Sequence, residues 1–180
     1  MSSPYYDDYG CRVFCPKGAV QVSTFLLIDG TAYFVYLGYV RPGITIKHVE
    51  FYVSTGGTGA QTAEVGIFST PSAPSKAGQS LTKLAASGSL DSLTSTGVKR
   101  NTASLAYALT ASKHLWAGIR TAMATNEPTL GGLANDNGQG HILSLAAAGA
   151  LTAAGPFAGG LITAAAPGTS QAPALRVVLD

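Results

Sequence analysis

The strongest constraint on the fold of this chain is the close spacing of turn signals between short apolar runs. A DG pair at 29–30, a PG pair at 42–43, the segment TGGTGAQ at 55–61 and NDNGQG at 135–140 interrupt the chain. No amphipathic pattern of helical length links the apolar runs, which argues against a helical bundle and a parallel α/β sheet. We therefore predict an all-β chain folded as a jelly-roll-like β-sandwich. The candidate strands are residues 20–28, 31–40, 44–54, 62–70, 104–110, 114–123, 129–134, 141–147, 157–166 and 174–180, while 81–90 fits a strand or one helical turn.

Two local patterns refine this prediction. Within 44–54 the apolar side of the strand changes, because Ile46 and Val49 are three residues apart, and this change indicates a bulge or a crossing between environments. The DG pair between 20–28 and 31–40 predicts either a hairpin or a tight connection.

The low charge of the chain limits the classes of partner. Only 11 % of the residues are charged and the formal net charge is +2, with Lys99-Arg100 as the only adjacent basic pair. This pattern lacks the clustered basic residues of a nucleic-acid site or of a polybasic membrane patch, so neither partner is expected. The uncharged stretch 142–175 contains several Gly and Pro residues and predicts short strands with turns instead of a membrane span, and the N-terminus does not resemble a secretory signal. The weakly charged surface suggests instead a molecule that is covered in an assembly.

The first eighteen residues differ in composition from the rest. This segment shows no regular helical or strand period, so we divide the chain into an N-terminal arm at 1–18 and a β-sandwich domain at 19–180. The arm would dock as a strap on its own domain or as a clamp on a neighbouring subunit. We predict that its interface anchors are Tyr5, Tyr6, Tyr9, Cys11, Phe14 and Cys15.

The two cysteines of the arm form a C-x3-C pair. Two thiols do not complete a structural zinc site, which takes four ligands, and the three histidines lie in separate candidate elements. Unpaired thiols, a local disulfide across a tight turn and a disulfide between subunits stay open.

Motifs for catalysis are not apparent in the sequence. G-x-S-x-G, H-E-x-x-H, a P-loop and a dinucleotide-binding glycine motif do not occur, and acidic residues are scarce. The segment 135–140 resembles the start of a calcium loop but lacks its acidic pattern and closing Glu, so a turn explains it better. We expect neither an enzyme nor a bound metal or cofactor, and we interpret His114 and His141 as strand-end or interface residues.

The aromatic residues allow two interpretations. Most are expected in the sandwich core, although exposed Tyr or Trp beside Asn, Asp and Gln is also typical of sugar-binding sites. Such a site would use exposed aromatics and the loops at 55–61 and 126–141. The candidate glycan-binding residues are Asn126, Asn135, Asp136, Asn137 and His141, and the aromatic set is Tyr33, Phe34, Tyr36, Tyr39, Phe51, Tyr52, Phe68, Tyr107 and Trp116.

The segments TAYFVYLGYV (31–40), ITIKHVEFYVSTGGTGAQTAEVGIFSTPSAPSKAGQSLTKLAASGSLDSL (44–93) and HLWAGIRTAM (114–123) together resemble virion structural modules of tailed bacteriophages and prophages. The resemblance covers 31–123 and rests on texture, without a diagnostic motif. It implies a non-enzymatic β-sandwich that acts as a capsid decoration (cement) protein on the outer surface of the phage head, after synthesis in the host cytoplasm. The implied partners are the major capsid protein and copies of the chain itself, as a homotrimer or, next, a dimer. A carbohydrate-binding module of a head or tail fibre, used for host attachment, is the alternative.

Overall fold

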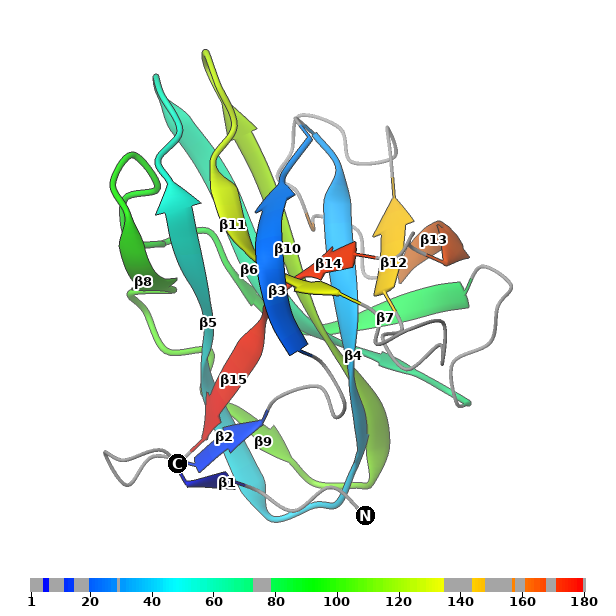
Figure 1. Cartoon of the computed structure of the whole chain (residues 1–180). Coiled ribbons are helices and arrows are strands. Elements are labelled where there is room, and N and C mark those ends of the chain that lie inside the picture. The colour runs from blue at the N-terminus through cyan, green and yellow to red at the C-terminus, as the bar shows by residue number, and fades with distance from the viewer. Residues whose placement is uncertain are drawn as a thin grey trace.

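The computed structural model contains two antiparallel sheets that pack against each other, and it contains no helix among the residues described (Figure 1). The structure describes residues 5–6, 12–14, 20–28, 30–72, 79–134, 144–147, 157, 161–167 and 171–179. The predicted all-β sandwich is confirmed. The strands are β1 (Tyr5–Tyr6), β2 (Arg12–Phe14), β3 (Val20–Leu26), β4 (Ala32–Val40), β5 (Ile44–Thr55), β6 (Gln61–Thr70), β7 (Gln79–Ser87), β8 (Gly97–Arg100), β9 (Tyr107–Leu109), β10 (Lys113–Met123), β11 (Thr129–Ala134), β12 (Ser144–Ala147), β13 (Leu161–Pro167), β14 (Gln171–Pro173) and β15 (Arg176–Leu179).

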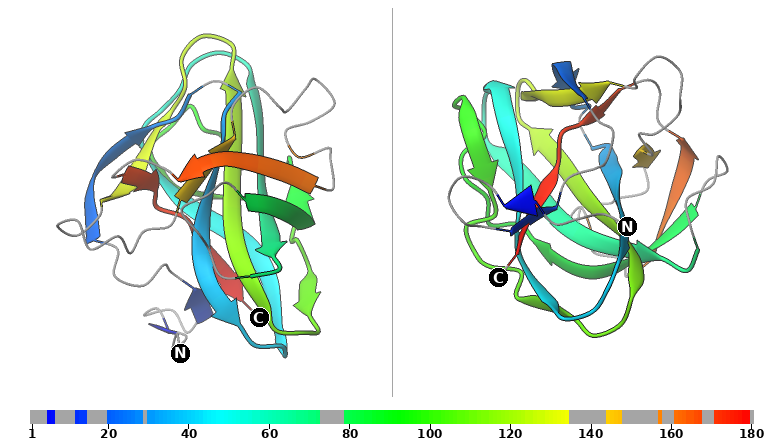
Figure 2. Two further views of the ribbon diagram at one scale, coloured as in Figure 1. Left: turned by 90° about the vertical axis from the view of Figure 1, so that its right-hand side faces the viewer. Right: turned by 60° about the horizontal axis from the view of Figure 1, so that its bottom comes forward.

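The second of the two sheets closes on itself. Its order is β10-β4-β12-β13-β7-β6, and β6 pairs again with β10 along ten residue pairs. In Figure 2 the orange strand β13 lies beside the green strand β7, where their pairing completes the ring. The first sheet is open, with the order β1-β2-β15-β5-β11-β14, and β3, β8 and β9 extend it. We call the second sheet the closed sheet.

The closure gives the molecule two separate cores. One lies between the two sheets and contains residues from both, such as Val35 and Ile119 from the closed sheet and Val49 and Phe51 from the open sheet. The other lies inside the closed sheet. Strands β4, β6 and β10 therefore bury both faces, which explains why their sequences are apolar without clean alternation. The inner core is Ala32, Phe34, Phe68, Leu81, Trp116 and Phe157.

Two glycines that pair across β6 and β10 make room for the inner core. Gly66 lies opposite Gly118 in the register, and a Cβ on Gly118 would lie 2.7 Å from Phe68 and 2.8 Å from Phe34. The Phe34 and Phe68 rings meet edge to face with centroids 5.0 Å apart. The absence of two side chains on the strands is thus what allows the aromatic rings to fill the interior.

Phe157 closes the inner core from a separate part of the chain. Its ring is fully buried, 4.8 Å from the Phe68 centroid and 6.0 Å from that of Phe34. Its backbone N–H donates to Glu64 at 2.9 Å, and Lys83 Nζ donates to its carbonyl oxygen. The polar groups of the Phe157 backbone are therefore satisfied inside the ring by side chains of β6 and β7.

The bulge predicted within 44–54 is confirmed. Val178 pairs with His48 and Leu179 with Ile46, so Lys47 is the extra residue on β5. The buried Asn101 bonds the backbone on this stretch, accepting from the Val49 N–H at 2.8 Å and donating to the Lys47 carbonyl at 3.2 Å. Because the bulge changes the strand's facing, both Ile46 and Val49 reach the core.

The connection at 29–30 joins the two sheets and is not a hairpin. Strand β3 pairs with β11 in the open sheet, while β4 belongs to the closed sheet. Gly30 has a φ of 69°, its N–H bonds Thr121 O at 3.1 Å, and Arg120 Nε donates to its carbonyl at 3.1 Å. Of the two predicted alternatives, the tight connection is correct.

The region predicted to lack a regular period contains two short strands. Strand β1 pairs with β2, and β2 pairs with β15 through Val13↔Val178 and Phe14↔Val177. Main-chain pairing at a sheet edge needs no alternation of side chains, so the sequence pattern did not reveal it. The sequence also failed to predict β8 and β14, and it left open the strand β7.

Candidate functional site

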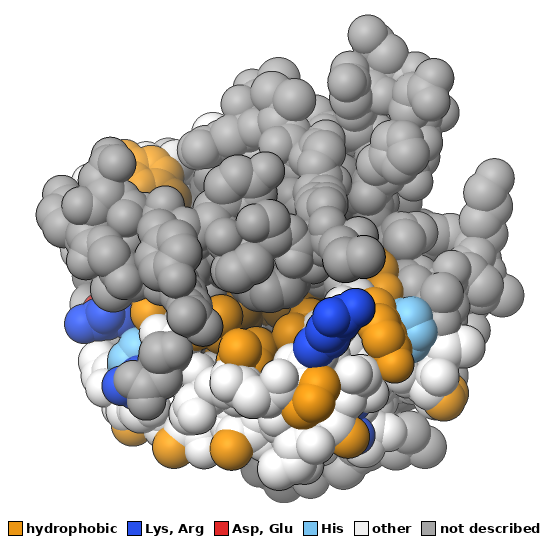
Figure 3. All heavy atoms as spheres, turned by 90° about the horizontal axis from the view of Figure 1, so that it is seen from below, with side chains coloured by type: hydrophobic (Ala, Val, Ile, Leu, Met, Phe, Trp, Pro, Cys, Tyr) orange, Lys and Arg blue, Asp and Glu red, His pale blue; other side chains and the backbone are white. Residues whose placement is uncertain are grey.

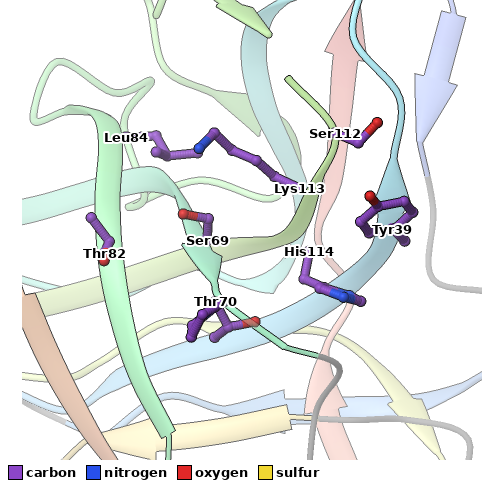
Figure 4. Close-up of a pocket in the computed structure, with 9 residues that line it drawn as sticks. Tyr39, Ser69, Thr70, Thr82, Leu84, Ser112, Lys113 and His114 are labelled. Atoms are coloured by element: carbon purple, nitrogen blue, oxygen red, sulfur yellow. The ribbon is translucent and has the colours of Figure 1, made fainter. Parts of the chain in front are cut away.

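A hollow of about 800 Å³ lies at the end of the closed sheet (Figure 4). It forms where β4 and β6 end, where β10 begins, and along the middle of β7. The volume falls in the range of small-ligand sites. Its lining residues are Tyr39, Ser69, Thr70, Pro71, Thr82, Leu84, Ser112, Lys113 and His114.

A row of aromatic rings leads from the inner core into this hollow. The Tyr36 centroid lies 5.1 Å from the Trp116 ring and 6.1 Å from the His114 ring, and the His114 ring lies 4.8 Å from Tyr39. Trp116 is 1 % exposed, Tyr36 and His114 are half-buried, and Tyr39 is 57 % exposed. We call these four residues the aromatic row.

A second bulge places the aromatic row on one face. Tyr39 pairs with His114, Leu115 with Gly38 and Trp116 with Tyr36, so β4 has one extra residue. Gly38 has a φ of 119°, a backbone conformation that favours glycine. Without the extra residue, Tyr36 and Tyr39 would point to opposite faces of the sheet. A glycine inside an apolar run was the sequence signal for this bulge.

Hydrogen bonds fix the inner members of the row. The Tyr36 hydroxyl lies 2.7 Å from Nδ1 of His114, and Trp116 Nε1 donates to Thr70 Oγ1 at 3.2 Å. Burial raises the pKa of Tyr36, so the hydroxyl keeps its proton well into the alkaline range. With a neutral His114, this hydroxyl donates to Nδ1 and the ring proton is on Nε2.

The charge at the hollow is positive. Lys113 is half-buried and lines the hollow, whereas none of the lining residues is acidic. In Figure 4 the Tyr39 and His114 side chains lie next to each other, while Lys113 extends away from them toward Leu84. Figure 3 shows the molecule from below, where the described surface carries more hydrophobic and basic side chains than acidic ones.

The predicted glycan-binding residues do not meet at this hollow. Asn126 lies beyond the opposite end of β10, where its Nδ2 donates to Thr58 Oγ1 at 3.1 Å. Asn135, Asp136, Asn137 and His141 lie outside the described residues, as does the 135–140 turn. The predicted aromatic set divides: Phe34, Phe68 and Trp116 are core residues, whereas Tyr39 and Tyr52 are exposed.

The predicted arm anchors are described only in part. Tyr5, Tyr6 and Phe14 lie on β1 and β2, and their backbone positions alone are described. Tyr9, Cys11 and Cys15 lie outside the described residues. The role of the arm and the state of its thiols therefore stay predictions.

The described histidines have separate surroundings. His48 Nδ1 lies 2.9 Å from the Asn101 carbonyl beside the β5 bulge, while His114 lines the hollow. In the described part of the chain no three His, Cys, Asp or Glu residues group as metal ligands would. That part also holds no helix that is long and apolar enough to cross a membrane. Comparison with protein-family models, curated proteins and solved structures finds no match for this chain.

Proposed function

We propose that the chain is a non-enzymatic capsid decoration (cement) protein of a tailed phage, which stabilises the head by bridging capsid subunits. In this proposal it sits on the outer surface of the head after synthesis in the host cytoplasm. Its partners are the major capsid protein and further copies of itself, as a homotrimer or, next, a dimer. The 1–18 segment serves as the anchor.

The observation that carries this proposal is the way the N-terminal segment joins the sheet. Strands β1 and β2 extend the open sheet past β15, and β2 is aligned with β15 over only two residue pairs. Among the described strands β1 pairs with β2 alone, so its outer backbone groups face away from the sheet. An edge of this kind accepts a strand of another subunit by main-chain hydrogen bonding.

Exposed apolar side chains on a second edge support the same function. Leu26 is 62 % exposed and Ile28 is 61 % exposed, and both follow the edge strand β3, which pairs with β11 only among the described strands. The two side chains are two residues apart and share a direction on extended backbone. Apolar residues at an unprotected edge are a hazard for a free monomer but are suitable for a subunit contact.

The test uses phage heads that lack their decoration protein. The full chain is expected to bind them and raise the temperature at which they release DNA, and deletion of 1–17 is expected to abolish both effects. The double variant Leu26→Ser/Ile28→Ser, which keeps the N-terminal hairpin, is expected to weaken binding. A monomer with no affinity for heads, whose truncation changes nothing in particle stability, would contradict the proposal.

A second candidate is a carbohydrate-binding module of a head or tail fibre. The hollow favours it, since it combines an exposed tyrosine with hydroxyl groups and a lysine. Binding on a glycan array supports this candidate, and the position and copy number of the chain in images of the particle separate it from the first.

A further inference from the structure

The hollow at the end of the closed sheet has two chemically different sides. Tyr39 and His114 present ring surface on one side, and Lys113 brings a cation toward Leu84 on the other (Figure 4). Exposed hydroxyl side chains at Thr82 and Ser112 lie on its rim. A ligand that matches both sides has an apolar ring face, several hydroxyl groups and an anionic group.

The aromatic side is rigid before any ligand arrives. Tyr39 packs on His114, His114 is held through Nδ1 by the Tyr36 hydroxyl, and Tyr36 packs on the fully buried Trp116. A ring held by such a chain of contacts loses little conformational freedom on binding. The exposed tyrosine is thus a prepared stacking surface, unlike Tyr52, for which no ring contact is found among the described residues.

The cationic side is not neutralised by the protein. The structure gives the Lys113 ammonium no hydrogen bond or ion pair within the described residues, and the described acidic side chains are engaged elsewhere. Glu50 pairs with Arg176 at 2.7 Å, Glu64 accepts from the Phe157 N–H, Glu127 from the Met123 N–H, and Asp91 from the Arg100 N–H. An anionic group of a ligand near Lys113 meets no carboxylate that would repel it.

Hydroxyl groups of the hollow differ in their availability. Thr70 Oγ1 accepts from Trp116 and donates to the Ser72 carbonyl at 2.9 Å, so its donor is used. Thr82 and Ser112 are exposed, and no hydrogen bond of their side chains is found in the described part of the chain. They are therefore available to exchange hydrogen bonds with a ligand that carries many hydroxyls.

We infer that the hollow binds an acidic oligosaccharide, with a pyranose ring stacked on Tyr39 and a uronate carboxylate near Lys113. This inference rests on the second candidate function and assigns its site and its ligand class. A pyranose supplies the apolar face for Tyr39 and the hydroxyls for Thr82 and Ser112. Because Tyr39 and Lys113 face different sides, the ligand spans more than one sugar ring.

The experiment is a titration of the full chain, followed by NMR and calorimetry, with trigalacturonate and with its fully methyl-esterified form. The acid form is expected to bind more tightly, with shifts confined to residues around the hollow. Tyr39→Ala is expected to weaken binding about tenfold, the scale of losing one well-placed aromatic contact. Tyr52→Ala, a change at the other exposed tyrosine, is the matched control and is expected to bind like the wild type.

Lys113→Gln separates the charge from the stacking. It is expected to remove the preference for the acid over the ester while leaving binding of the ester unchanged. Binding that Tyr39→Ala leaves unchanged, or shifts outside the hollow, would overturn the site. If wild-type chain binds glycans on an array but binds neither trigalacturonate form, the second candidate function stands and this inference fails. An array without any binding overturns both.

Discussion

The inner core of the closed sheet and the hollow at its end are built from the same kinds of residue, yet they differ in what those residues can do. Phe34, Phe68 and Phe157 are fully enclosed, whereas Tyr39 at the other end of the aromatic row is 57 % exposed. In the inner core every ring meets other rings of the protein, so its contribution is to stability. At the hollow the last ring has a partner on one side only, so its free surface is available for a ligand.

The largest expected effect tests the inner core. Phe157→Ala removes a buried ring while its backbone bonds to Glu64 and Lys83 can persist, so the loss is one of packing. We expect a decrease in the free energy of unfolding of about 3–5 kcal/mol, measured by urea denaturation. A decrease below 1 kcal/mol would show that the ring is not part of a tight core.

The next effect tests the space that the paired glycines leave. In Gly118→Ala the new methyl group would contact Phe34 and Phe68 at less than van der Waals distance, and we expect a loss of about 1–3 kcal/mol in the same measurement. Gly88→Ala is the matched control, because the nearest atom to its Cβ is Ala63 O at 3.6 Å. Equal stability of the two variants would contradict the crowded interior.

The third effect concerns pH and the middle of the aromatic row. Burial raises the pKa of Tyr36 above its ordinary value of 10.0, so the folded state holds this proton more tightly than the unfolded state. The contribution of Tyr36 to stability is therefore complete below pH 10 and is lost as the pH rises through the folded-state pKa. Unfolding curves measured from pH 8 to 11 are expected to fall less steeply for Tyr36→Phe than for the wild type. Because the pKa values of Tyr33 and Tyr107 are also raised by burial, the variant keeps part of the alkaline loss, and an unchanged slope would contradict the assignment to Tyr36.

The smallest expected effect on stability lies at the exposed end. Tyr39→Ala removes a side chain that is more than half exposed, and we expect a change of less than about 0.5 kcal/mol in the free energy of unfolding. A change as large as that of Phe157→Ala would place Tyr39 in the core and remove the distinction between the two regions.

Several features of the fold could be predicted from the sequence because they depend on local chemistry. Turn residues at 29–30 and 42–43 and the apolar runs between them led to the strands β3, β4 and β5, and the spacing of Ile46 and Val49 revealed the β5 bulge. The short strands β8 and β14 were not predicted, since pairing with a neighbour stabilises them without an apolar period of their own.

The candidate site could be predicted only in its ingredients. Tyr36, Tyr39, Trp116 and His114 were all noticed, but the first three were expected in the core, and the glycan-binding prediction fell on the turn residues near 126–141. The hollow depends on β4 pairing with β10 and on the extra residue at the second bulge, which bring together residues 78 positions apart, Tyr36 and His114. A single sequence does not state such pairings.

By itself the sequence determined that the chain is all-β, where its main strands and turns lie, and that its charge is too low for a basic or acidic binding surface. The tertiary structure alone decided that one sheet closes on itself, that β4, β6 and β10 therefore bury both faces, and that the aromatic row runs from a dry core to an open hollow. The physical reason is that turn chemistry and apolar spacing act over a few residues, whereas strand register and sheet closure are set by the packing of segments far apart in the chain.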